Sequence, residues 1–156
     1  MEKIKVLFIC HGNICRSPMA EFVLKDMVQK QGLAQNFQIA SAATSTEEIG
    51  NSVHHGTKAI LNRLGISCAS KTARQMTRAD YAEYDYIIGM DSANIRNMTR
   101  IVGGDDLGKI YKLLTFAQRE DDVADPWYTG NFEVTYQDVQ AGCAGFLNWL
   151  QEKGRI

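Results

Sequence analysis

The chain opens with IKVLFICHGNICRSP at residues 4–18, which holds three elements in a row. The first is almost entirely apolar, as in a strand buried on both faces of a parallel sheet. A short loop follows, beginning with Cys10 and ending with Arg16. Ser17, as a candidate N-cap, and Pro18 are typical of a helix start. This order aims backbone N–H groups, a guanidinium and a thiol at one point, which suits a tetrahedral oxyanion such as phosphate.

Strands and helices alternate along the rest of the chain. The apolar pattern predicts strands at 5–10, 37–42, 84–90 and 109–114, and helices at 18–30, 51–64, 92–101 and 132–151. We therefore expect one domain over residues 1–156 with an α/β fold in three layers. Its four-stranded parallel sheet should carry helices on both faces, as in flavodoxin-like or Rossmann-like folds. Ligands of such sheets bind beyond the carboxyl ends of the strands, where Cys10, Asp91 and the segment after Leu114 should meet.

Composition narrows the classes of function. The 156 residues carry a formal charge of −1 and no run of lysine and arginine, so we expect no nucleic-acid partner. No apolar stretch reaches the ~20 residues that span a bilayer, and no signal peptide is evident. The four cysteines, at 10, 15, 68 and 143, are too few for a disulfide-stapled secreted fold. We expect a cytoplasmic protein without a membrane partner, and a monomer or weak dimer.

The loop residues have separate physical roles. Gly12 should allow backbone dihedrals closed to other residues, and Asn13 tolerates a left-handed conformation. The planar fork of Arg16 can hold two phosphate oxygens. Positive potential, with a hydrogen bond from Ser17, should favour the thiolate of Cys10 at neutral pH. That thiolate could attack a bound phosphoryl group and form a cysteinyl-phosphate. A cysteine alone is more often a small core residue, but the whole set favours a nucleophile.

A phosphate ester also needs a proton donor for its leaving oxygen, and later a base that activates water. The best candidate is Asp125, in a polar loop that should return over the carboxyl edge of the sheet. Pro126 pushes Asp125 toward extended geometry. Trp127 and Tyr128 offer aromatic walls. The alternative is an ordinary Asp-Pro turn, which is the commoner meaning of such a dipeptide.

We expect no metal or other cofactor. His54 and His55 lack the cysteine or carboxylate pattern of a metal site. The carboxylates at 121, 122 and 125 are more simply a solvated acidic loop. A thiolate and Arg16 already supply a nucleophile and a positive charge.

These residues resemble the low-molecular-weight protein tyrosine phosphatases nearly from end to end. The matching motifs are CHGNICRSP at 10–18, SAATS at 41–45, ARQ at 73–75, MD at 90–91 and DP at 125–126. The resemblance implies hydrolysis of phosphotyrosine in proteins or of small aryl phosphates. It implies Cys10 as nucleophile, Arg16 as phosphate clamp, and Asp125 as acid and then base. It places the phosphate on the loop residues His11, Gly12, Asn13, Ile14, Cys15, Arg16 and Ser17, with His11 at the rim.

The resemblance also implies two supporting features. Asn13, Ser17 and Ser41 would form a hydrogen-bond network that holds the loop in shape. Cys15 would be the second loop cysteine, able to form a reversible disulfide with Cys10 and so protect it from over-oxidation. The alternative for Cys15 is a packed small residue.

The sequence departs from the family at two positions. Glu47 stands where most relatives carry an aromatic residue, which forms one wall of the substrate cleft. In this chain the resemblance implies a cleft lined by Glu47, Trp127 and Tyr128. Because Glu47 and Glu48 repel a dianionic substrate, we expect a preference for substrates with basic groups near the phosphate, or weak activity overall. Lys71 stands where many relatives have a histidine in the supporting network. A charged lysine accepts no hydrogen bond, so the loop should be held differently.

Two other functions fit the loop. A thiol-based arsenate reductase uses the same loop and fold, but it needs a relay of cysteines near residues 80–90, where this chain has none. A phosphate-dependent binding module or cysteine phosphocarrier needs no acid for a leaving group. Arg16 and Asp125 favour the phosphatase over both.

Overall fold

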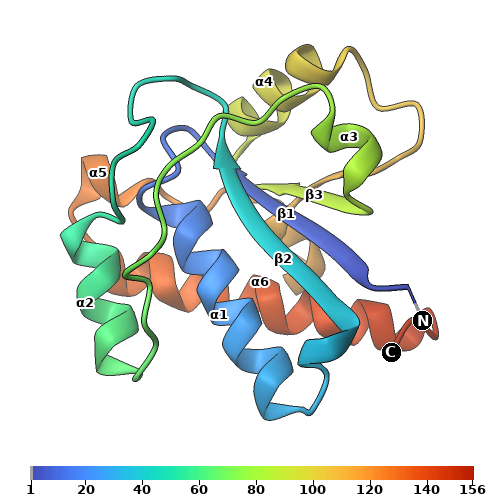
Figure 1. The fold of residues 1–156 in the computed structure, drawn as a ribbon, viewed down its shortest axis with the longest axis horizontal. Coiled ribbons are helices and arrows are strands. Elements are labelled where there is room, and N and C mark those ends of the chain that lie inside the picture. The colour runs from blue at the N-terminus through green and yellow to red at the C-terminus, as the bar shows by residue number, and fades with distance from the viewer. Residues whose placement is uncertain (1) are drawn as a thin grey trace.

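A computed structural model describes residues 2–156 and shows a four-stranded, wholly parallel sheet between two layers of helices (Figure 1). The strands are β1 (Ile4–Cys10), β2 (Phe37–Ala43), β3 (Tyr86–Gly89) and β4 (Ile110–Lys112), in the order β2-β1-β3-β4. The expected α/β fold is confirmed. The central strand β1 ends at Cys10, so the loop that follows it leaves the middle of the sheet at its carboxyl edge.

Helices cover both faces of the sheet. They are α1 (Arg16–Lys30), α2 (His55–Arg63), α3 (Asp80–Glu83), α4 (Ser92–Val102), α5 (Pro126–Thr129) and α6 (Phe132–Glu152), with 3₁₀ turns η1 (Ala34–Asn36) and η2 (Leu113–Ala117). In Figure 1, α1, α2 and α6 lie on one side of the sheet and α3 and α4 on the other. No helix within residues 2–156 combines the length and apolar character needed to cross a bilayer.

Alternation along β1 divides the core into two parts. Val6 and Phe8 pack in the larger cluster with α1 and α6, whereas Leu7 and Ile9 pack in the smaller cluster with α4. All four side chains are fully buried. A strand with both faces covered by helices needs this continuous apolar sequence.

Helix starts differ most from the expectations. Ser17 is not an N-cap, because α1 begins at Arg16, which precedes Ser17. Cys15 occupies the cap position without a side-chain hydrogen bond. The helix expected from residue 51 or 52 begins only at His55. His54 caps it by accepting a hydrogen bond from Gly56 N, whereas Ser52 forms an isolated bridge with Thr72.

The structure also differs from the expectations in the buried face of α2 and in the lengths of two strands. The apolar spacing predicts an inner face of α2 with Ala59, Ile60 and Leu64. Ile60 is buried as predicted, whereas Ala59 and Leu64 are exposed, and Thr57 and Leu61 are buried beside Ile60. The fourth strand is shorter than expected because the chain turns into η2 after Lys112. The third strand covers only four of the seven expected residues, and the short helices α3 and α5 were not expected.

Candidate active site

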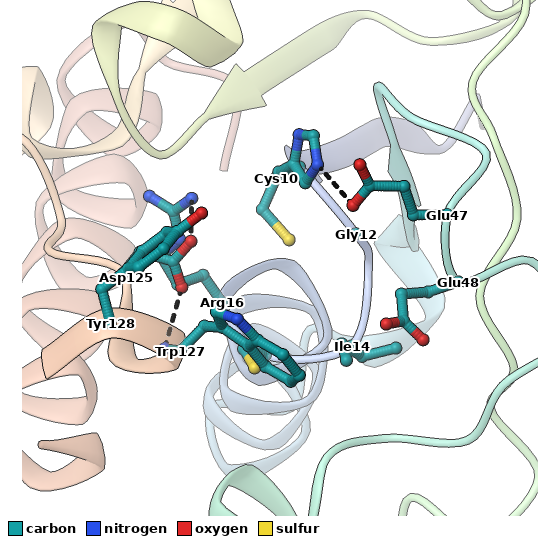
Figure 2. A pocket seen from close by; sticks show the side chains of 11 residues that line it. Cys10, Gly12, Ile14, Arg16, Glu47, Glu48, Asp125, Trp127 and Tyr128 are labelled. Carbon is teal, nitrogen blue, oxygen red and sulfur yellow. Dashed lines mark hydrogen bonds and ion pairs between the residues drawn. The ribbon is translucent and has the colours of Figure 1, made fainter. Parts of the chain in front are cut away.

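A cavity of about 110 Å³ opens beyond the carboxyl end of β1 (Figure 2). The side chains that line it come from the loop after β1, from the segment after β2 and from the start of α5. They are Cys10, His11, Gly12, Ile14, Cys15, Arg16, Glu47, Glu48, Asp125, Trp127 and Tyr128. The structure thus brings together the loop, the Asp-Pro segment and the cleft residues, which lie far apart along the chain.

The loop turns its carbonyl groups away from the cavity. Three of them accept hydrogen bonds from the surrounding chain: His11 O from Ser45 N at 3.1 Å, Ile14 O from His54 N at 2.9 Å, and Cys15 O from Thr57 Oγ1 at 3.0 Å. All described peptide bonds are trans. In a trans peptide, the N–H group that follows a carbonyl points the opposite way. The N–H groups of Gly12, Cys15 and Arg16 therefore point toward the cavity side, where an anion would sit.

Backbone dihedrals separate the roles of two loop residues. Asn13 has a φ of 58°, the left-handed conformation expected of it. Gly12 does not have a left-handed φ, contrary to expectation. A Cβ atom at Gly12 would lie 3.3 Å from Cγ of Glu48, so the absence of a side chain leaves room for that glutamate at the rim.

The thiol of Cys10 is surrounded by hydrogen-bond donors. Its Sγ lies 3.1 Å from Oγ of Ser17 and accepts a hydrogen bond of 3.3 Å from the backbone N–H of Asn13. The side-chain amide of Asn13 donates to Ser17 Oγ at 2.8 Å and to Ser41 Oγ at 2.9 Å. Ser17 Oγ accepts from Asn13, and its own hydroxyl proton has two acceptors within reach, Cys10 Sγ at 3.1 Å and the carbonyl of Ala42 at 3.4 Å. Asn13, Ser17 and Ser41 are buried behind the loop rather than lining the cavity.

A buried ion pair stands at the far end of this network. Ser41 Oγ donates to Glu21 Oε1 at 2.5 Å, and Lys71 Nζ donates to the carbonyl of Ser41 at 2.9 Å. Nζ of Lys71 also lies 3.7 Å from Glu21. Burial lowers the pKa of Lys71, while the charge of Glu21 opposes that shift. Glu21 was not among the predicted site residues; its signal in the sequence is a carboxylate among the apolar positions of the first helix.

Arg16 is held from behind by two partners and touches a third. Its Nη1 donates to Asp91 Oδ2 at 2.7 Å and to the carbonyl of Val123 at 2.9 Å, and its Nη2 lies 3.4 Å from Asp125 Oδ2. Burial alone would lower the pKa of Arg16, but Cys10, Asp91 and Asp125 raise it. Asp91 also caps α4 by accepting from Asn94 N. The sequence placed Asp91 at this edge without assigning it a contact to Arg16.

Asp125 lies at the cavity as the N-cap of α5. Its Oδ1 accepts a hydrogen bond of 3.0 Å from Trp127 N, with Pro126 in the first turn. The other oxygen faces Arg16. Trp127 and Tyr128 are mostly exposed, at 59% and 84%. They form the open aromatic side of the cavity (Figure 2).

The opposite side of the cavity is acidic. Figure 2 shows Glu47 and Glu48 across Cys10 from Trp127 and Tyr128. Glu47 Oε2 lies 2.9 Å from His11 Nε2 in an exposed pair. The cavity therefore has an aromatic side and an acidic side, with Cys10 between them.

His54 occupies a place that the sequence did not predict. Its ring stacks on Phe132 at 5.0 Å between centroids and on His55 at 4.2 Å, and it meets Trp127 edge-on at 5.8 Å. Burial, followed by the charge of His55, lowers its pKa. His54 thus caps α2 and packs against Phe132 at the start of α6 and against Trp127 on the aromatic side of the cavity. Over residues 2–156, no three or more His, Cys, Asp and Glu side chains gather to hold a metal ion.

The second loop cysteine is buried next to the nucleophile candidate. Burial, together with the charges of Cys10 and Asp125, raises the pKa of Cys15 to about 12. Cys10 and Cys15 are both free thiols in this structure, as are Cys68 and Cys143. Cys15 is therefore protonated at neutral pH, in contact with the cavity.

Comparison with known proteins gives one consistent result. The family model "Low molecular weight phosphotyrosine protein phosphatase" matches residues 5–156. The low molecular weight protein-tyrosine-phosphatase YfkJ of Bacillus subtilis is 42% identical over 155 residues, covering 98% of this chain and 99% of YfkJ. The crystal structure of YfkJ superposes with a TM-score of 0.94 over 98% of each chain. SP-PTP, a low molecular weight protein tyrosine phosphatase from Streptococcus pyogenes, is 45% identical, with a TM-score of 0.82 over 96% of this chain and 92% of its own.

Proposed function

Since the chain belongs to the low molecular weight phosphotyrosine protein phosphatases, we propose that it hydrolyses phosphotyrosine or small aryl phosphates through a cysteinyl-phosphate on Cys10. The observation that carries this proposal is the meeting of a thiol, a guanidinium and a carboxyl group at one small cavity. Asp125 favours ester cleavage over phosphate binding alone, because a binding module needs no acid for a leaving oxygen.

In the first step, the Cys10 thiolate attacks phosphorus and the bond from phosphorus to the phenol oxygen breaks. Asp125, as the carboxylic acid, gives its proton to that oxygen. Arg16 has five N–H donors, of which contacts to Asp91, Val123 and Asp125 use three. The remaining two, with the loop N–H groups, would hold the phosphate oxygens.

In the second step, Asp125 acts as a base. Its carboxylate takes a proton from a water molecule whose oxygen attacks phosphorus, and the bond from sulfur to phosphorus breaks. The thiolate leaves and accepts a hydrogen bond from Ser17, which lies 3.1 Å from Cys10 Sγ. The hydroxyl of Ser17 would therefore stabilise both the attacking and the departing sulfur.

Neither step requires a metal ion or another cofactor. We expect hydrolysis of p-nitrophenyl phosphate at an unchanged rate in EDTA, because Arg16 and the loop N–H groups supply the positive charge. Acid quenching during turnover, followed by peptide mass spectrometry, should place a phosphate on Cys10. Loss of activity in EDTA that magnesium restores, or a phosphate found on another residue, would contradict this mechanism.

We assign Cys15 a protective role in the same site. Oxidation of the Cys10 thiolate by peroxide would give a sulfenic acid and remove one of the charges that raise the pKa of Cys15. The neighbouring Cys15 could then attack the sulfenic sulfur and form a disulfide with release of water. The proximity of the two thiols at one cavity supports this assignment.

The carboxylates of Glu47 and Glu48 repel a dianionic substrate, so we expect a preference for substrates with basic groups near the phosphate. Replacing Glu47 by tyrosine should raise kcat/KM for aryl phosphates by roughly 2- to 10-fold, because an aromatic wall replaces a repelling carboxylate. Steady-state kinetics with p-nitrophenyl phosphate measure this gain. Glu47→Gln is the matched control, since it removes the charge without adding a ring. Unchanged kinetics in Glu47→Tyr would show that Glu47 takes no part in substrate binding.

A further inference from the structure

Asp125 is carried by an irregular segment that we call the acid loop, residues 118–125. It runs from η2 to α5 without helix or strand. A proton donor acts only when its oxygen lies within hydrogen-bond distance of the leaving group, so an irregular loop must be fixed in place. The contacts that fix this loop therefore bear on the chemistry of Asp125.

One carboxylate oxygen of the acid loop accepts three of these contacts. Asp122 Oδ1 accepts from the backbone N–H of Ser92 at 3.1 Å, from Ser92 Oγ at 3.3 Å and from Lys112 Nζ at 3.0 Å. Lys112 Nζ also donates to the carbonyl of Glu120 at 2.6 Å. Ser92 directly follows Asp91, the residue that holds Arg16. Asp122 thus ties the acid loop to the start of α4 and, through Lys112, to β4.

The charge on Asp122 is favoured by this arrangement. Burial would raise its pKa, but the hydrogen bonds and charge of Lys112, with the hydrogen bonds of Ser92, outweigh burial and lower it. The carboxylate is therefore ionised at neutral pH. The side chain of Lys112 is 19% exposed and that of Asp122 is 47% exposed, so the contact lies at the surface. Three charge-assisted hydrogen bonds on one carboxylate oxygen hold the loop better than a single exposed ion pair does.

The short path from Asp122 to Asp125 is fixed at each residue. Val123 N donates to Met90 O at 2.9 Å, and Val123 O accepts from Arg16. Thr135 Oγ1 on α6 donates to Ala124 O at 3.2 Å. Three residues span only about 10 Å of extended chain, so the anchors of Asp122 lie close enough to Asp125 to add to those of Val123 and Ala124 in holding it.

We propose that Asp122, held by Ser92 and Lys112, is a positioning residue that sets the place of the general acid Asp125. The proposal rests on the proposed role of Asp125 as the acid. Asp122 does not line the cavity and acts through the backbone of the acid loop.

The test compares two substrates that differ in their need for an acid. Phenolate is a poor leaving group and depends on the proton from Asp125, whereas p-nitrophenolate leaves readily without it. Asp122→Ala should lower kcat/KM for phenyl phosphate by about 10-fold and affect p-nitrophenyl phosphate far less. Inhibition by inorganic phosphate should not change, because the loop and Arg16 bind phosphate.

The neighbouring carboxylate supplies a matched control. Asp121 pairs with Arg119 inside the acid loop, and Arg119 has its own hydrogen bond of 2.8 Å to Asp138 on α6, which does not involve Asp121. Asp121→Ala removes the same charge one residue away and should leave both substrates unaffected. Asp122→Asn keeps an acceptor for Ser92 and should give a smaller loss with the same dependence on the leaving group. It serves as the test if Asp122→Ala does not give a cooperative thermal unfolding transition.

A variant without the acid separates this proposal from the proposed function. In an Asp125→Asn background, Asp122→Ala should cost nothing further, because two residues that act through one proton transfer are not additive. An additional loss there, equal losses on both substrates, or weaker phosphate inhibition would overturn the role of Asp122. If Asp125→Asn alone shows no dependence on the leaving group, the assignment of Asp125 as the acid fails instead.

Discussion

Replacing Cys10 by serine is expected to lower kcat/KM for p-nitrophenyl phosphate by at least about 10⁴-fold. A serine hydroxyl stays protonated at neutral pH, and the nearest groups would not take its proton. Ser17 Oγ and Asn13 N, at 3.1 and 3.3 Å from Sγ, are placed to donate hydrogen bonds to the sulfur. These donors suit an anion already formed and do not remove a proton from a serine hydroxyl. Steady-state hydrolysis of wild type and variant measures the loss.

Two controls accompany this variant. Cys68→Ser removes another buried thiol, outside the cavity, and should keep wild-type turnover. Cys10→Ser should itself still bind vanadate or inorganic phosphate, because the loop N–H groups and Arg16 remain. Turnover within about tenfold of wild type would contradict the assignment of Cys10 as nucleophile.

Replacing Asp125 by asparagine is expected to slow hydrolysis of phenyl phosphate by about 10²–10⁴-fold, with a smaller effect on p-nitrophenyl phosphate. Asparagine keeps an oxygen that can accept from Trp127 N, so the cap of α5 is retained while the transferable proton is lost. Comparison of kcat/KM for the two substrates measures the effect. Asp125→Ala removes the acid and the cap together and should show at least the same loss.

Phosphate inhibition is the control for Asp125→Asn. Arg16 keeps its hydrogen bonds to Asp91 and Val123 in this variant, so the affinity for inorganic phosphate should stay the same or rise as a nearby negative charge is removed. Equal losses on phenyl and p-nitrophenyl phosphate, with weakened phosphate binding, would mean that Asp125 shapes the site and does not donate a proton.

The sequence predicted the sheet and the residues around the cavity because their signals are local. The continuous apolar run of β1 requires that both faces of the strand be covered, and both are covered. The loop after β1 and the Asp-Pro segment follow elements whose carboxyl ends share one edge, so Cys10 and Asp125 had to meet if the strands were parallel.

The contacts that hold these residues could not be read from the sequence because they join distant segments. Glu21 reaches the loop only through Ser41, 20 residues away, and Asp122 reaches α4 through Ser92, 30 residues away. The late start of α2 has a similar cause. His54 stacks on Phe132 of α6 and caps the helix, so tertiary packing overrides the serine and asparagine that precede it.

The order of the reactive groups along the chain has a consequence during synthesis on the ribosome. The thiol of Cys10 emerges early, but the strand that pairs with β1 on its other side begins at Tyr86, and the carboxyl group of Asp125 comes later still. Helix α6, which covers one face of the sheet, follows Asp125 in the chain. A nascent polypeptide that stops before residue 125 thus lacks the carboxyl group to which we assign release of the phenol. We expect such truncated chains to be inactive toward phenyl phosphate.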